Sequence, residues 1–360
     1  PEEKTILTKL DEYGSFLLGL AQNDARAEVR TMTRWVILHL HRRALSSPRA
    51  LRISLSNRLR RLEEKIKNQD ESPDQSITPE QIKAVALDEE VSGDLSDEEA
   101  SGRVDQVVYG TLPTLEEEAR HLRALIEYAR SVTPSKDSKL RELTKKDGYL
   151  DNAMRGKYGP RKVIIFTRYT DTLDYLVQEI PKRLKTIENS QIFAVYGDLN
   201  EIKRREVMDK FIEAEKGILV ATDCISEGVN LQHMANQVIH YELPWNPNRL
   251  EQRNGRIDRF GQPEREVHIR TIVMRNTFDT RVLKILYDKA QKIRDDYGFS
   301  PPFFGNDADV LALIGNSLIQ ADVPPSQRTL FDSFTGEGEP APRIDPFSTE
   351  ILDKIKNESF

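Results

Sequence analysis

The sequence predicts an α/β fold in which a parallel sheet is flanked by helices on both faces, preceded by a largely α-helical N-terminal region. Five apolar, β-branched runs, each typical of a buried strand, recur between residues 161 and 274. Helical segments alternate with these runs, which is the pattern of a parallel sheet with helices on both faces. By contrast, residues 1–67 show helical periodicity.

The expected strands follow one another through the second half of the chain, at residues 161–167, 191–197, 217–223, 237–243 and 267–274. Helices are expected at residues 171–184, 200–214 and 278–298. Ligands of such sheets gather at the carboxyl ends of the strands. The residues at these predicted ends are therefore candidates for a site: Thr167, Gly197, Thr222 and Asp223.

Residues 244–263, PWNPNRLEQRNGRIDRFGQP, predict one further helix, which Gly261 stops. On such a helix Gln252, Arg256 and Arg259 share one face. Two arginines on a rigid helix suit a phosphate chain that gains charge during cleavage. The alternative is a solvated basic helix flanked by salt bridges. The opposite face should be buried through Leu250, Ile257 and Phe260.

Composition narrows the classes of protein. The 360 residues suggest two or three domains, and the net charge of -6 excludes a uniformly basic nucleic-acid coat but allows a local basic surface. The single cysteine, Cys224, excludes an intramolecular disulfide and fits a reducing compartment. No run is long and apolar enough to span a bilayer. We therefore expect a cytoplasmic protein that has no membrane contact.

Changes of composition predict five parts. They are a basic helical region at 1–67, an acidic flexible insert at 68–110, helices and a linker at 111–160, the α/β part at 161–298, and a Pro-rich tail at 299–360. Residues 79–87 could form a short helix within the acidic insert. Because the chain opens PEEKTILTKL, without an initiator Met, we expect it to be cut from a longer protein.

The helical segment 41–67 carries most of the basic charge of the N-terminal region. Pro48 breaks it, and Ser46 or Ser47 can cap the helix that follows. Arginines around an apolar stripe favour contact with a phosphate backbone. The alternative is a solvated helix whose arginines meet the acidic segment downstream. The candidate contacts are Arg58, Arg60 and Arg61.

Only part of the chemistry of a nucleotidase is present in the sequence. It contains no GxxxxGK[ST] motif, no GxGxxG after a strand and no acidic pair at a strand end. Asp198 and Asp223 are isolated carboxylates, and His39 and His41 lie on different faces of a helix, so we expect no metal site. Cys224 is expected to be an ordinary small residue. The sequence thus has arginines that could stabilise a transferring phosphate but no residues that could hold Mg²⁺. This is what one half of a shared nucleotide site would contain.

Four motifs occur in a fixed order: VIIFTRYTDTLDYL (163–176), YGDLNEIKRREVMDKF (196–211), ILVATDCISEGVNLQ (218–232) and EQRNGRIDRFGQ (251–262). Together they resemble the C-terminal RecA-like helicase lobe of superfamily 2, in its Swi/Snf-like branch. The resemblance covers residues 161–298 and extends weakly over 137–160. The flanking PWNP and FGQ sharpen the match to Swi/Snf-like ATPases, and we interpret Trp245 as a packing anchor, with base stacking as the alternative. The final motif, Q-x-x-G-R-x-x-R, is met by Gln252, Gly255, Arg256 and Arg259.

The resemblance implies that ATP with Mg²⁺ binds between two RecA-like lobes, and that an absent N-terminal lobe of the same protein carries the P-loop and the Mg²⁺ ligands. Arg256 and Arg259 then match the arginine fingers, and Gln252 would lie near the γ-phosphate. The positions that match nucleotide contacts are Glu227, Gly228 and Asn230. The positions that match contacts with the DNA backbone are Thr167, Arg168 and Thr222. Ser226-Glu227-Gly228 departs from the Gly-rich turn of many eukaryotic members, which leaves the role of Glu227 open.

The leading hypothesis is the C-terminal half of an ATP-dependent translocase of double-stranded DNA, inactive without its other lobe. The helical region is similar to the region between the lobes of bacterial RapA-like members or of a phage-defence component, so RNA polymerase or phage-defence proteins are candidate partners. One alternative is a non-catalytic module that docks on nucleic acid or protein through the basic helix 41–67. Another is a strand-separating helicase.

Overall fold

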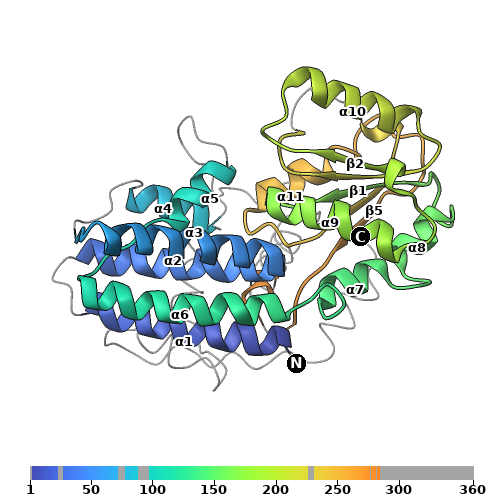
Figure 1. The fold of residues 1–360 in the computed structure, drawn as a ribbon. Helices are drawn as coiled ribbons and strands as arrows, with labels where there is room; N and C mark the ends of the chain where they lie inside the picture. The colour runs from blue at the N-terminus through green and yellow to red at the C-terminus, as the bar shows by residue number, and fades with distance from the viewer. Residues whose placement is uncertain are drawn as a thin grey trace, which may run out of the picture.

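The computed structural model describes residues 2–22, 27–71, 78–87, 97–225, 231–275, 277–280 and 282–283. They form a helical region and an α/β lobe that lie side by side (Figure 1). The nucleotide contacts expected at Glu227, Gly228 and Asn230, most of the helix expected at 278–298 and the whole tail at 299–360 lie outside the described residues. None of the described helices is long and apolar enough to cross a membrane.

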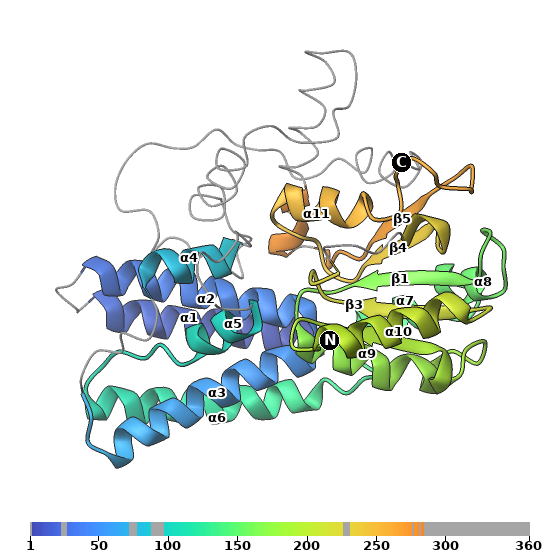
Figure 2. The same ribbon diagram turned by 90° about the horizontal axis from the view of Figure 1, so that it is seen from above.

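The helical region confirms the fold class expected for the N-terminal part of the chain. Its helices are α1 (Glu2–Gln22), α2 (Ala27–Ser46), α3 (Pro48–Lys67), α4 (Pro79–Leu87), α5 (Asp97–Asp105) and α6 (Leu112–Ser131). Ser47 begins α3, because its hydroxyl accepts a hydrogen bond from the Ala50 backbone N–H, and Pro48 occupies the first turn, which needs no N–H. In both ribbon views α3 and α6 run alongside each other (Figures 1 and 2).

The acidic segment at 68–110 differs from a flexible insert at two places. Residues 79–87 form α4 and residues 97–105 form α5. Their apolar side chains are buried in the core of the helical region, among them Ile82, Val85 and Val104, each fully buried. Burial of these side chains against α2 and α3 overrides the polar composition of the segment.

The α/β lobe contains the five predicted strands, all parallel, in the order β2-β3-β1-β4-β5. The strands are β1 (Lys162–Phe166), β2 (Ile192–Val195), β3 (Gly217–Ala221), β4 (Gln237–His240) and β5 (His268–Thr271). The remaining helices are α7 (Ser138–Thr144), α8 (Tyr149–Met154), α9 (Thr170–Arg183), α10 (Glu201–Glu213) and α11 (Pro247–Asn254), with short 3₁₀ turns at Asn189–Gln191 and Leu231–His233.

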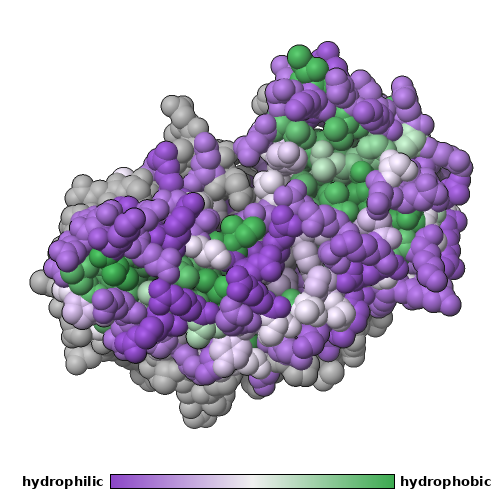
Figure 3. All heavy atoms as spheres, viewed as in Figure 1, coloured by the Kyte–Doolittle hydropathy of each residue, from purple (hydrophilic) through white to green (hydrophobic). Residues whose placement is uncertain are grey.

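Side chains of the central strand alternate between the two faces of the sheet. Val163 and Ile165 pack in the same core as α7, α8 and α9. Ile164 and Phe166 pack in the other core, with Phe211 of α10. Because both faces are buried, the strand reads as one continuous apolar run. The face of the molecule that Figure 3 shows is largely hydrophilic, with hydrophobic patches below α10 and on the helical region.

Candidate functional site

The carboxyl ends of the central strands meet at one edge of the sheet. Phe166, which ends β1, pairs in register with Ala221 of β3 and His240 of β4. Residues just beyond these positions therefore come together. Thr167 Oγ1 donates to a carboxylate oxygen of Glu242 at 2.8 Å, and the backbone N–H of Arg168 donates to the same carboxylate.

Asp223 links the end of β3 to α11. Its carboxylate accepts hydrogen bonds from Arg249 Nη1 at 3.0 Å and from Arg253 Nε and Nη2 at 2.6 and 3.0 Å. Burial opposes ionisation, but the two guanidinium groups outweigh it and hold the pKa of the Asp223 carboxyl well below its usual range. The isolated carboxylate expected from the sequence is in fact an anchor for two arginines. Among the described residues no group of metal-ligating side chains could hold an ion.

The helix expected to run to Gly261 is shorter than predicted. α11 ends at Asn254, and the chain continues in turns, with the Gly255 N–H donating to Glu251 O and the Asp258 N–H to Asn254 O. The prediction that Arg256 and Arg259 share a helix face with Gln252 is therefore wrong. Glycine is a poor helix former. His240 Nε2, at the end of β4, lies 2.8 Å from Asn254 Oδ1 and fixes the helix at this point.

The turns after α11 form an anchored loop. Ile257 is fully buried, as predicted, but Phe260 is 100% exposed, so the prediction that it packs in the core is wrong. The side-chain amide of Gln262 donates to the carbonyls of Ala235 and Ile257, both at 3.0 Å. Gly261 has a φ of +93°, a conformation that favours glycine. The loop is thus held at several points although it is not helical.

Arg256 and Arg259 differ from the two arginines before them. Arg249 and Arg253 are buried and tied to Asp223. Arg256 is half-buried and Arg259 is exposed, and neither has an ion-pair partner among the residues that the structure describes. Gln252, on the last turn of α11, is also exposed. The three candidate catalytic residues thus lie on α11 and on the loop that follows it.

Burial limits the contacts with DNA that were expected in the lobe. Thr167 is fully buried, Arg168 is 4% exposed and Thr222 is 7% exposed. Burial is the largest cause of a strongly lowered pKa at Arg168, followed by repulsion from Arg42. These side chains would have to become more accessible before a nucleic-acid backbone could contact them, and the contacts stay predictions.

The basic surface expected on α3 is also reduced. Arg58 is 4% exposed, and its Nε donates to Glu118 at 2.7 Å and to the Tyr13 hydroxyl at 2.8 Å. The guanidinium of Arg58 thus lies in the core of the helical region, and its contact with phosphate stays a prediction. Arg61 lies 3.7 Å from Glu64, within α3 itself, and Arg60 is exposed.

Trp245, Cys224 and the two histidines of α2 have local structural roles. Trp245 is 1% exposed and its Nε1 donates to Asp279 at 2.9 Å, as a packing anchor would. Burial raises the pKa of the Cys224 thiol, which keeps it protonated. His39 Nε2 lies 3.0 Å from Asp105, whereas His41 Nε2 lies 3.2 Å from Asp11.

Glu242, whose carboxylate accepts hydrogen bonds from the turn after β1, was not among the predicted site residues. A signal was present, because Glu242 is the one charged residue in the apolar run 237–243. A carboxylate in such a run needs buried hydrogen-bond donors, and the strand ends provide them.

A parallel sheet covered by helices, with arginines on a loop at its carboxyl edge, defines a RecA-like lobe, which confirms the fold class predicted from the sequence. The family model of the helicase conserved C-terminal domain matches residues 145–261. Residues 145–261 thus form a helicase conserved C-terminal domain, and this part of the chain is similar to the C-terminal lobe of Snf2-like superfamily 2 helicases.

Two relatives show how far the similarity extends. The "Uncharacterized ATP-dependent helicase YqhH" of Bacillus subtilis is 40% identical over 136 residues, which are 36% of this chain and 22% of that protein. The "RNA polymerase-associated protein RapA" of Vibrio parahaemolyticus is 29% identical over 131 residues, 36% of this chain and 13% of that protein. The chain thus matches about a fifth of YqhH. Among solved structures, the C-terminal part of the Fun30 ATPase domain is similar, with 17% identity, a TM-score of 0.48, and coverage of 88% of this chain and 94% of that chain.

Proposed function

We propose that this chain supplies the transition-state-stabilising half of the ATP site of a DNA-dependent, Snf2-like translocase. The observation that carries the proposal is the contrast between two pairs of arginines. Asp223 forms ion pairs with Arg249 and Arg253, whereas Arg256 and Arg259 have no ion-pair partner within the described part of the chain. An arginine finger must be uncommitted until it meets the charge that develops on the transferring phosphate.

The other half of the site would come from a second RecA-like lobe. The sequence has neither a P-loop nor an acidic box, which are the parts that cradle phosphates and hold Mg²⁺. When bound, Mg²⁺ would neutralise charge on the phosphates from that lobe. Gln252 would orient the attacking water or the γ-phosphate from this one. The resemblance adds Glu227, Gly228 and Asn230 as nucleotide contacts.

We propose that the polymer on which the protein moves is duplex DNA, because the relatives include Snf2-like proteins. The contacts expected at Thr167, Arg168 and Thr222 would then require α2 or neighbouring segments to move, because these side chains are buried. Among the arginines of α3, Arg52 and Arg60 remain exposed. The burial of Arg58 weakens the alternative of a docking module built on that helix. RapA is named for its association with RNA polymerase, and for this chain RNA polymerase is a candidate partner.

The requirement for a second lobe is testable by phosphate release. The 360-residue chain alone is expected to hydrolyse ATP negligibly, with or without duplex DNA, because it has no phosphate cradle. A full-length protein with the proposed P-loop lobe is expected to show DNA-stimulated hydrolysis. DNA-stimulated turnover by the chain alone would overturn the shared site, and a strand-displacement assay on the full-length protein separates a translocase from a strand-separating helicase.

A further inference from the structure

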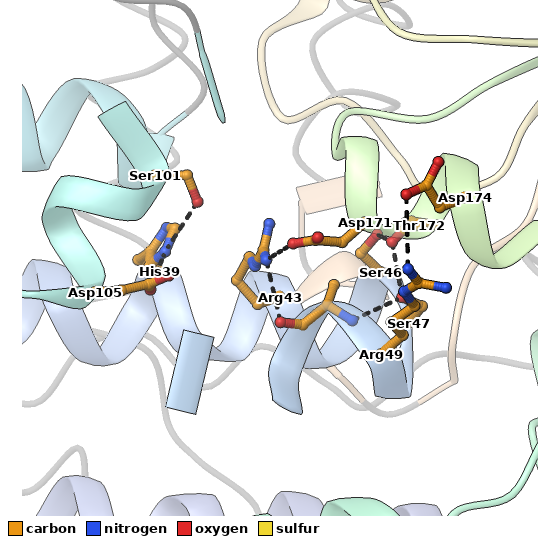
Figure 4. Close-up of polar contacts among 11 residues, drawn as sticks. His39, Arg43, Ser46, Ser47, Arg49, Ser101, Asp105, Asp171, Thr172 and Asp174 are labelled. Carbon is orange, nitrogen blue, oxygen red and sulfur yellow. Dashed lines mark hydrogen bonds and ion pairs between the residues drawn. The ribbon is translucent and has the colours of Figure 1, made fainter. Parts of the chain in front are cut away.

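The last turns of α2 reach the start of α9 in the α/β lobe (Figure 4). Arg43 Nη2 donates to the carboxylate of Asp171, and the guanidinium lies 4.4 Å from the ring centroid of Tyr169. The Arg43 side chain is 1% exposed and that of Asp171 is 17% exposed. Arg43 Nη2 also donates to the backbone carbonyl of Ala50 at 3.1 Å, so one guanidinium joins α2, α3 and the start of α9.

The α2–α3 elbow, residues 43–49, makes a second contact with the same part of the lobe. The hydroxyls of Ser46 and Ser47 each lie 2.7 Å from Thr172 Oγ1, and Thr172 is fully buried. Ser47 also caps α3, so the residue that begins this helix contacts α9 as well. Farther out, Arg49 lies 3.6 Å from Asp174, but both of these side chains are partly exposed, at 28% and 47%.

Toward its middle, α2 is tied to the rest of the helical region. His39 Nε2 lies 3.0 Å from Asp105 and 3.4 Å from Ser101, both on α5. Arg42 Nη1 donates to the carbonyls of Val85 and Ala86 at the end of α4, at 3.3 and 3.1 Å. The Arg42 guanidinium also lies 4.6 Å from the ring of Trp245, just before α11. The helix α2 thus connects α4 and α5 to the turn after β1 and to the segment just before α11.

These contacts bear on the placement of the candidate fingers. Tyr169, Asp171 and Thr172 directly follow Thr167 and Arg168, which bind Glu242 beyond β4. The chain continues from Glu242 through Trp245 into α11 and then into residues 255–262, the finger loop, which carries Arg256 and Arg259. We propose that Arg43 is a positioning residue for the ATP site. It holds the turn after β1 against the helical region, and because Glu242 binds that turn, Arg43 also fixes the position of the start of α11. The inference rests on the proposed function, and Arg43 itself touches no nucleotide.

The mechanical part of the inference is tested on the 360-residue chain by hydrogen exchange. Arg43→Gln is expected to accelerate exchange of the amides of residues 167–173 about tenfold or more, while amides of α10 keep their rates. Arg49→Gln, which removes an exposed ion pair from the same elbow, is the control and should change these rates less than about threefold. Asp171→Asn removes the anionic partner of Arg43 from the lobe side and tests the same contact, should Arg43→Gln fail to fold. Unchanged exchange at 167–173 in the folded variants would overturn the inference, and so would equal acceleration everywhere.

The functional part is tested on the full-length protein. Arg43→Gln is expected to lower kcat for ATP about tenfold with an unchanged KM, because a finger acts in the transition state. Arg43→Lys should recover part of kcat, and Arg49→Gln should match the wild type. Wild-type kcat in Arg43→Gln would overturn the positioning role. A wild-type protein without ATP turnover would instead refute the proposed function, and hydrogen exchange would still decide whether Arg43 holds the turn.

Discussion

Four arginines lie between residues 249 and 259, and the surrounding side chains divide them into two kinds. Arg249 and Arg253 are buried and share the carboxylate of Asp223. Arg256 and Arg259 lie on the loop beyond α11, where no described acidic group pairs with them. A single carboxylate at the end of β3 thus fixes the helix and leaves the last two arginines available.

Asp223→Asn tests the structural half of this division. The substitution leaves two buried guanidinium groups without their anion, and we expect it to lower the free energy of unfolding at pH 7 by about 2 kcal/mol. The pKa of Asp223 is lowered in the folded state, so the stabilisation is present above the unfolded pKa near 3.9 and is lost as the pH falls below it. Urea unfolding of both proteins at pH 7 and at pH 3 measures the difference.

Asp174→Asn is the matched control for this change, because Asp174 pairs with Arg49 while 47% exposed. It should cost at most about 0.5 kcal/mol. An Asp223→Asn variant as stable as this control at pH 7 would show that Asp223 does not anchor α11.

At the scale of elements, α11 is held by the strand that precedes it. His240 at the end of β4 contacts Asn254, the last residue of α11, and Ile257 then returns the chain to the core. Burial, followed by repulsion from Arg253, lowers the pKa of His240 to about 3, so its imidazole is neutral when the protein is folded. The end of this helix therefore depends on a contact between residues 14 positions apart.

The neutral His240 predicts an acid-dependent loss of stability. Because its folded pKa of about 3 lies below the usual histidine pKa of 6.5, the unfolded chain binds the proton first. The contribution is complete above pH 6.5 and is lost as the pH falls toward 3, by at most about 1.4 kcal/mol per pH unit. In the variant His240→Gln, the free energy of unfolding should depend less steeply on pH in this window. His121→Gln, at an exposed histidine, should leave the slope unchanged, and equal slopes for all three proteins would contradict a neutral buried His240.

At the scale of the whole molecule, the sequence predicted the elements well and the contacts between distant elements poorly. All five strands were predicted, because each is an apolar run buried on both faces. The end of α11 was not, since helical periodicity continues past Gly255, and the contact of Asn254 with His240 that fixes the end is not visible in the local sequence. The packing of α2 against the turn after β1 was also not predicted. It depends on pairs such as Arg43 and Asp171, which are 128 residues apart, and local patterns carry no information about them.

The central claim is that Arg256 meets the charge of the transferring phosphate, and Arg256→Ala in the full-length protein tests it most directly. Arg265→Ala, at an exposed arginine beyond the finger loop, is the control for loss of positive charge. DNA-stimulated phosphate release is measured beside the Kd for ATP. We expect Arg256→Ala to lower turnover about a thousandfold or more while the Kd for ATP changes less than about threefold, and Arg265→Ala to match the wild type. Near-normal turnover in Arg256→Ala would contradict the claim.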